Sequence, residues 1–142
     1  MLLFSGDKLG PYEIVSRIGA GGMGAVWKAR DPRLNRDVAI KVSDARFSER
    51  FGREARAVAA LNHPNICQFN DVGPYYIVTE YIDGAPPRGP LAPAEAVKLA
   101  LGIAAGLEAA HEKGITHRDL KPANILIARS GVKLLDFGRN RR

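Results

Sequence analysis

Cysteine is almost absent from this chain of 142 residues, since Cys67 is the only one. One thiol cannot build a disulfide framework, and it leaves no cysteine cluster for a structural metal. The sequence therefore favours a reducing compartment, and we expect the cytoplasm. The role that best suits Cys67 itself is that of a small buried hydrophobic residue.

Long uninterrupted apolar runs are also missing. The apolar part of the N-terminus, residues 1–4, is too short for a signal peptide. The longest apolar region contains Glu95, Lys98 and Glu108. We therefore expect no membrane-spanning segment. Internal repeats and low-complexity segments are absent as well, and a content of 46% hydrophobic and 25% charged residues is ordinary for a globular protein.

The chain has a surplus of basic residues, with a formal net charge of +6. A basic protein can bind nucleic acid. Here the basic residues are scattered, the only dense cluster is Arg139, Arg141 and Arg142, and no platform of aromatic and basic residues accompanies them. Positive charge also suits a site for phosphate groups. We expect no nucleic-acid partner, and a basic nucleic-acid-binding protein stays a remote alternative.

The segment 115–124, Ile-Thr-His-Arg-Asp-Leu-Lys-Pro-Ala-Asn, is followed twelve residues later by Asp136-Phe137-Gly138. It offers a carboxylate base in Asp119, a cation in Lys121, and hard oxygen ligands for a divalent ion in Asn124 and Asp136. Phosphoryl transfer needs such groups, because its transition state spreads negative charge over oxygens. Two predicted strands, 124–127 and 132–135, form a hairpin that would bring Asn124 and Asp136 close together.

A glycine-rich segment, 19–24, lies between predicted strands 12–18 and 25–29. Its Gly-x-Gly-x-x-Gly spacing also occurs in dinucleotide-binding folds, but there a helix follows the glycines. Here a strand follows, so the segment is interpreted as a hairpin lid whose backbone amides close on phosphate oxygens. A third predicted strand, 36–42, carries Lys41 in its apolar middle. Two further strands are predicted at 66–72 and 75–81.

Together these motifs resemble the protein kinase superfamily, and the form of 117–124 is similar to its bacterial serine/threonine branch. The resemblance implies that Asp119 accepts the proton of the substrate hydroxyl and that Lys121 contacts the transferred phosphoryl group. It implies Mg²⁺ at Asn124 and Asp136. Lys41 would hold the α- and β-phosphates, paired with Glu54.

The resemblance also assigns an ATP site and a hinge at 80–82. The residues that it places in the ATP site are Ile18, Gly19, Ala20, Gly21, Gly22, Met23, Gly24, Val26, Ala39, Lys41, Thr79, Glu80, Tyr81, Ile82 and Leu126. It matches His117 and Phe137 to a stacked set of side chains. An acidic residue that would bind the ribose has no clear match.

The implied fold class is α+β. We expect a leader at 1–11, a kinase N-lobe and hinge at 12–82 with a five-stranded antiparallel sheet and one helix near 47–61, and a linker at 83–93. An incomplete C-lobe would follow at 94–138, with one long helix at 94–113, the catalytic loop and a hairpin. A short tail, 139–142, ends the chain.

The resemblance extends from about Tyr12 to Gly138, whereas kinase domains are roughly 250 to 300 residues long. We therefore expect a truncated serine/threonine kinase domain, with ATP and a protein substrate as partners of the complete family. Its activity stays open, and the alternative is a non-catalytic ATP-binding module. We also expect an exposed helical patch that self-associates. The residues expected in that patch are Val97, Leu99, Leu101, Ile103 and Leu107.

Overall fold

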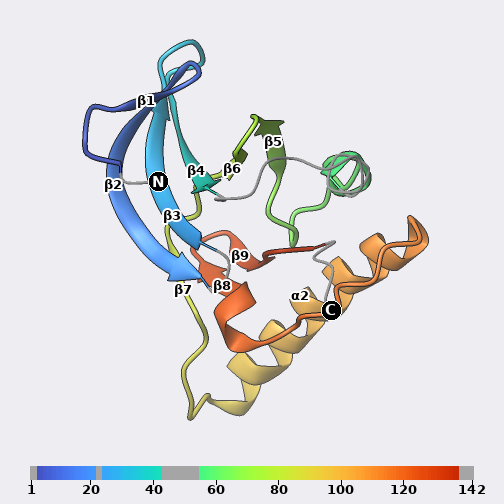
Figure 1. Cartoon of the computed structure of the whole chain (residues 1–142). Coiled ribbons are helices and arrows are strands. Elements are labelled where there is room, and N and C mark those ends of the chain that lie inside the picture. The colour runs from blue at the N-terminus through green and yellow to red at the C-terminus, as the bar shows by residue number, and fades with distance from the viewer. Residues whose placement is uncertain (1–2, 22–23, 43–54, 138–142) are drawn as a thin grey trace. The chain divides into compact units, whose positions relative to one another are not determined.

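The computed structural model describes residues 3–21, 24–42 and 55–137 (Figure 1). The chain divides into two compact units. The first, here called the sheet unit, comprises Met1–Gly52 and Phe69–Tyr81. The second, the helix unit, comprises Arg53–Gln68 and Ile82–Arg142. Glu54, a predicted site residue, and most of the helix predicted at 47–61 lie outside the described residues, and residues 55–59 are helical.

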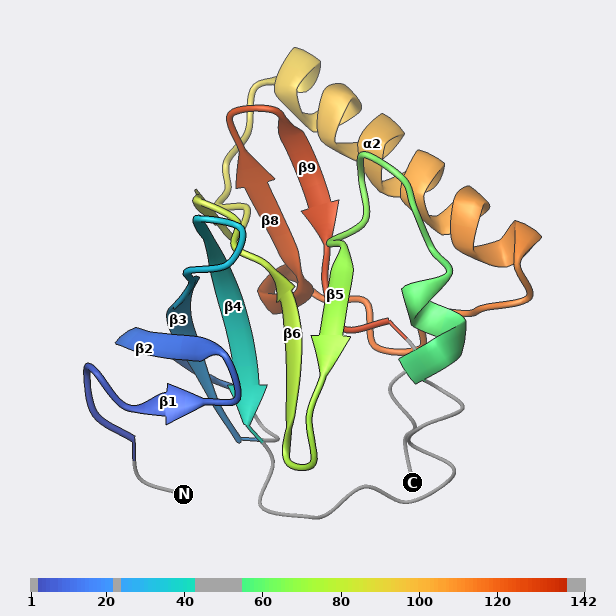
Figure 2. The ribbon, with the colours of Figure 1, turned by 90° about the horizontal axis from the view of Figure 1, so that it is seen from above.

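The sheet unit is built on an antiparallel sheet with the order β1-β2-β3-β4-β6-β5 (Figure 2). Its strands are β1 Lys8–Leu9, β2 Tyr12–Gly21, β3 Gly24–Asp31, β4 Arg36–Val42, β5 Phe69–Val72 and β6 Tyr76–Glu80. The predicted strands are all present. The sheet has six strands rather than the expected five, because β1, from the segment predicted as a leader, pairs with β2.

One face of this sheet forms the core of the unit. Alternation along β4 buries Val38, Ile40 and Val42 and leaves Ala39 and Lys41 half-buried on the other face. The core also contains Ile14, Trp27, Ala29 and Val78, and Leu3 from the N-terminal segment is buried against it. The residues between the buried ones therefore line a second face, which contributes nothing to this core.

The helix unit packs one long helix, α2 Pro93–Glu112, beside a small sheet with the order β7-β8-β9. Its remaining elements are β7 Gly84–Ala85, the 3-10 turn Pro122–Asn124, β8 Ile125–Ala128 and β9 Gly131–Leu134. The predicted helix and hairpin are confirmed. Pro93 occupies the first turn of α2, and Gly114, at φ +75°, follows its end. No helix among the described residues is both long and apolar enough to cross a bilayer.

Two predictions for this unit were wrong in part. The linker predicted at 83–93 contains β7, which pairs with β8 because Gly84 lets the two backbones approach: an added Cβ would lie 2.7 Å from the carbonyl oxygen of Ile127. Ile66, predicted to start a strand, instead forms an isolated parallel bridge with Leu134, and β5 begins at Phe69.

The buried side of α2 is set by glycines. An added Cβ would lie 2.2 Å from Val132 Cγ1 at Gly102 and 2.9 Å from Leu134 Cδ1 at Gly106. The helix therefore packs on β9 through its smallest residues. Leu99, Ile103 and Leu107, all expected in an exposed patch, pack half-buried against the core, and only Val97 and Leu101 of that set are exposed.

Candidate functional site

The described residues of the glycine segment lie at one end of the β2–β3 hairpin. Gly19 pairs with Val26, Ala20 with Ala25, and Gly21 with Gly24. A strand follows the glycines, as predicted, and not the helix that a dinucleotide fold requires. Residues 22–23, two of the predicted site positions, lie outside the described residues.

The face of the sheet opposite the core gathers four predicted site residues. Val26 on β3 is the cross-strand partner of Lys41 on β4, and Ala39 on β4 is the partner of Thr79 on β6. Such partners have Cβ atoms about 4.5–5.5 Å apart, so their side chains are neighbours. All four are half-buried. The arrangement places a cation beside a flat surface of small and apolar groups, next to the glycine turn.

The strand β6 leads into the predicted hinge. The hydroxyl of Thr79 donates a hydrogen bond to the carbonyl oxygen of Glu80 at 3.2 Å. The ammonium of Lys28 lies over the ring of Tyr81, 4.6 Å from the ring centroid. Ile18 on β2 is exposed. The other two predicted ATP-site residues, Ile82 and Leu126, belong to the helix unit and are half-buried there.

In the helix unit, two predicted site residues converge on Asp119, which is buried. The side-chain amide of Asn124 donates to the backbone oxygen of Asp119 at 2.8 Å and reaches its Oδ2 at 3.3 Å. The ammonium of Lys121 lies 3.6 Å from the same Oδ2. A buried carboxylate held by a donor and a cation is fixed in orientation.

His117 joins this loop to the strand end that carries Asp136. Its Nδ1 accepts a hydrogen bond from the backbone N–H of Asp119 at 3.1 Å. The ring proton therefore belongs to Nε2, which donates to the carbonyl oxygen of Leu135 at 2.6 Å. The ring also meets Phe137 edge-on, with centroids 4.5 Å apart. The family resemblance matches His117 only to a stacked set, and its two hydrogen bonds have no signal in the sequence.

The Asn124 and Asp136 segments are linked by the hairpin and by one further bond. Ile125 pairs with Leu134 in the β8–β9 ladder, and the N–H of Leu135 donates to the carbonyl oxygen of Asn124 at 2.9 Å. The predicted closeness of the two segments is confirmed. The left-handed backbone conformation, which side chains disfavour, occurs at Arg118, with φ +70°, and at Asp136, with φ +57°. Such strain costs of order 1–3 kcal/mol and is typical of functional sites.

The donor atoms at this end of the hairpin suit Mg²⁺. The Nδ2 of Asn124 is committed to Asp119, so Oδ1 is the atom of that amide that can ligate. Asp136, half-buried, offers a carboxylate. Both are hard oxygen ligands, of the kind that Mg²⁺ takes when it keeps several waters. The residues present therefore fit the ion.

A family model described as "Protein kinase domain" matches residues 12–142. The chain belongs to the protein kinase family. Serine/threonine-protein kinase PknB of Mycobacterium leprae is 45% identical in an alignment that covers 89% of this chain and 24% of the relative. Serine/threonine-protein kinase PrkC of Bacillus subtilis is 42% identical in an alignment that covers 91% of this chain and 22% of the relative.

The fold of a solved kinase domain agrees with this membership. The crystal structure of the PknI kinase domain of Mycobacterium tuberculosis superposes with a TM-score of 0.84 at 30% sequence identity, covering 96% of this chain and 62% of that one. The chain thus spans about a quarter of the length of its curated kinase relatives. Both expectations, the kinase family and the α+β fold, are confirmed.

Proposed function

We propose that this chain forms part of a serine/threonine protein kinase domain that transfers the γ-phosphoryl group of ATP to a protein hydroxyl. The observation that carries the proposal is the arrangement around Asp119. A buried carboxylate is held there by Asn124, Lys121 and the His117 loop, in the spacing that the family uses for its catalytic base.

In this proposal the helix unit performs the chemistry. Asp119 accepts the proton of the substrate hydroxyl as that oxygen attacks phosphorus. Lys121, whose ammonium already lies near the carboxylate, offsets negative charge on the phosphoryl oxygens. Asn124 and Asp136 would hold Mg²⁺, which supplies charge neutralisation on the phosphates when bound.

The sheet unit binds the nucleotide in this proposal. Lys41 pairs with the α- and β-phosphates, and the backbone amides of the glycine turn close over them. Val26 and Ala39 supply a flat apolar surface for adenine, on the face where the register places them. Backbone groups of Glu80 to Ile82 would hydrogen-bond the base, and Glu54 would brace Lys41.

Phosphate transfer from Mg-ATP to generic serine- and threonine-containing proteins tests the proposal. Asp119→Asn keeps a side chain of the same shape and removes the base, so transfer should fall about 10²- to 10⁴-fold while ATP affinity is kept. Asp83→Asn, an exposed acid of the same unit, is the matched control. Equal transfer by wild type and Asp119→Asn would refute the role of Asp119.

A second candidate is a nucleotide-binding module that does not turn over. One observation favours it: Val26, Ala39, Lys41 and Thr79 all belong to the sheet unit, so the main nucleotide face needs no group from the helix unit. ATP should then raise the melting temperature by mass action without phosphate transfer, and Lys41→Ala should abolish the rise. Transfer to protein substrates would reject this candidate.

A further inference from the structure

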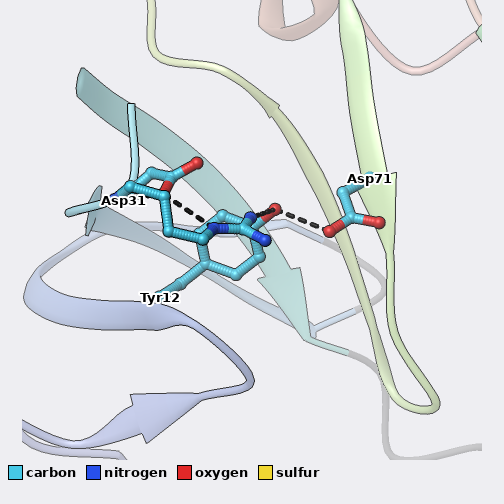
Figure 3. A network of polar contacts seen from close by, with 4 residues as sticks. Tyr12, Asp31 and Asp71 are labelled. Carbon is cyan, nitrogen blue, oxygen red and sulfur yellow. Dashed lines mark hydrogen bonds and ion pairs between the residues drawn. The ribbon is translucent and has the colours of Figure 1, made fainter. Parts of the chain in front are cut away.

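A hydrogen bond crosses the sheet unit between strands that are not neighbours. The hydroxyl of Tyr12, at the start of β2, donates to Oδ2 of Asp71 on β5 at 2.6 Å (Figure 3). In the sheet order β3, β4 and β6 lie between those strands. The contact is possible only because the sheet curls around its core, so that β2 and the edge strand β5 face each other.

Arg33, in the turn after β3, extends this bond into a network. Its backbone N–H and its Nε both donate to Oδ1 of Asp31, at 3.0 Å and 3.2 Å. Its Nη2 donates to the hydroxyl of Tyr12 at 3.4 Å, and its guanidinium carbon lies 5.5 Å from the centre of the Tyr12 ring. Asp31, at the end of β3, is fully buried. The network therefore links the start of β2, the end of β3 and β5.

The charge states of these groups suit a lasting link. Burial, followed by the hydrogen bond to Asp71, raises the pKa of Tyr12 to about 12, so the phenol keeps the proton that it donates. Burial by itself would raise the pKa of Asp31, but the hydrogen bonds from Arg33 and the neighbouring backbone outweigh it and leave that pKa below its ordinary value. The carboxylate thus stays ionised opposite the guanidinium.

The network lies at one end of the β2–β3 hairpin, here called the glycine hairpin; this end, its root, is opposite the glycine segment. Glu13 pairs with Arg30, so Tyr12 and Asp31 end the hairpin at the side away from the glycine turn. Between root and turn the β2–β3 register is irregular twice, between Ile14 and Ser16 and between Arg17 and Gly19. Such irregularities bend and twist a strand, so the hairpin is not a straight extension of the sheet. The Tyr12–Asp71 hydrogen bond adds a constraint at the end of the hairpin opposite the glycines.

Asp71, at the other end of the hydrogen bond, lies beside the strand that carries part of the proposed adenine surface. Asp71 on β5 pairs with Val78 on β6, and the next residue of β6 is Thr79, the partner of Ala39. We propose that the Tyr12–Asp71 bond is a tie that holds the glycine hairpin in register with β6, which makes Tyr12 and Asp71 positioning residues for nucleotide binding. This inference rests on the proposed function of the sheet unit.

A tie of this kind acts on one part of the ligand. The hairpin turn meets the phosphates, whereas β4 and β6 meet the base. Tyr12→Phe removes the hydroxyl and keeps the ring that packs edge-on against Tyr76. The affinity for Mg-ATP should fall about three- to tenfold, the range that corresponds to one hydrogen bond, while the affinity for adenosine should stay within about twofold.

The experiment measures the Kd of Mg-ATP and of adenosine by calorimetry for wild type, Tyr12→Phe, Asp71→Ala, their double mutant and Ile40→Val. The double mutant should lose less than the sum of the two single mutants, because the Tyr12–Asp71 bond is removed in both. Tyr12→Phe also removes the bond from Arg33, and Asp71→Ala also removes the bond from the N–H of Val72. Asp71→Asn, whose amide oxygen can still accept, should retain most of the affinity. Ile40→Val controls for lost stability, since it trims the same core without touching the network, and it should leave the ratio of the two Kd values unchanged.

Each outcome decides. A purely structural network would weaken both ligands alike, or lower only the melting temperature, and either result would overturn the inference. The same holds if Ile40→Val changes the ratio as much as Tyr12→Phe does. If wild type binds neither Mg-ATP nor adenosine, the proposed nucleotide site fails and the tie falls with it. If wild type binds both and Tyr12→Phe is unchanged, only the tie fails.

Discussion

The two units carry their functional groups in opposite ways. In the sheet unit the predicted site residues Val26, Ala39, Lys41 and Thr79 lie half-buried on the face that the core does not use. In the helix unit His117, Asp119 and Asn124 are themselves buried, at 2%, 5% and 4% exposure. Substitution of the predicted site residues should therefore affect stability little in the first unit and more in the second.

The reason lies in the backbone. A strand alternates its side chains between two faces, so one face can form a core and the other can remain available to a ligand. In the loop 117–124 the polar side chains of His117, Asp119 and Asn124 are buried with the backbone that carries them, whereas Arg118 and Lys121 are exposed. Buried polar groups must be hydrogen-bonded, so these groups bond to one another and to the ends of β8 and β9.

The largest effect is expected where site and core coincide most, at His117. His117→Ala removes two hydrogen bonds and the edge-on contact with Phe137, and it leaves a buried amide and a half-buried carbonyl without these partners. The free energy of unfolding should fall by about 3–5 kcal/mol. Denaturant titration measures it. His111→Ala, at an exposed site on α2, should change stability by no more than about 0.5 kcal/mol. Similar losses in the two variants would contradict this expectation.

The next effect tests what positions α2 on β9. Helix propensity alone makes Gly102→Ala stabilising by about 0.8–1 kcal/mol. The added Cβ would lie 2.2 Å from Val132 Cγ1, on a stiff β-branched side chain, so we expect a net loss of about 1–3 kcal/mol. Gly106→Ala should cost less, because its nearest contact, 2.9 Å away, is the flexible end of Leu134.

Removing the side chain that the new Cβ would meet tests whether this contact causes the loss of stability. The double mutant Gly102→Ala/Val132→Ala should be more stable than the sum of its single mutants predicts, because the second change removes the clashing methyl group. Thermal unfolding of the four proteins gives the coupling. Simple additivity would mean that the helix moves away and that the glycine is not required for close packing.

A smaller effect in the sheet unit appears at alkaline pH. The pKa of Tyr12 is raised to about 12, above its ordinary value, so the unfolded chain loses this proton first as pH rises. The stabilisation is complete below about pH 10 and is lost as pH rises toward 12. Burial also raises the pKa of Tyr76, which adds to the same trend. Melting temperatures should thus fall more steeply between about pH 10 and 12 in wild type than in Tyr12→Phe. Parallel curves would show that the hydroxyl carries no such linkage.

The smallest effect on stability is expected at Lys41, where it sharpens the comparison. Lys41→Ala changes a half-buried residue on the sheet face opposite the core, where nucleotide binding is proposed, so the free energy of unfolding should change by less than about 1 kcal/mol. Binding of Mg-ATP should nevertheless be lost, as isothermal titration can show. Lys133→Ala, a half-buried lysine of the helix unit, is the matched control and should bind as wild type does. A large stability loss at Lys41 would place this residue in the structural framework instead.

Much of the site could be predicted because its signals are local. The alternation around Val38 to Val42 predicts a strand with two faces, and the register then makes Val26 and Thr79 neighbours of that strand. The spacing of Asn124 and Asp136 predicts the hairpin that joins them. The rotational setting of α2 was not predictable in this way, because it depends on two glycines whose partners, Val132 and Leu134, come later in the chain.

The sequence by itself thus determined most of the strands, the long helix, the kinase family and the side chains proposed for phosphoryl transfer, since each depends on residues that are close together in the chain. Only the tertiary structure decided that His117 bonds Leu135, that Gly102 and Gly106 seat α2, and that Tyr12 reaches Asp71, 59 residues away. Those contacts depend on how far a sheet curls and how closely a helix approaches it. Both are properties of the packed core as a whole, and no local pattern encodes them.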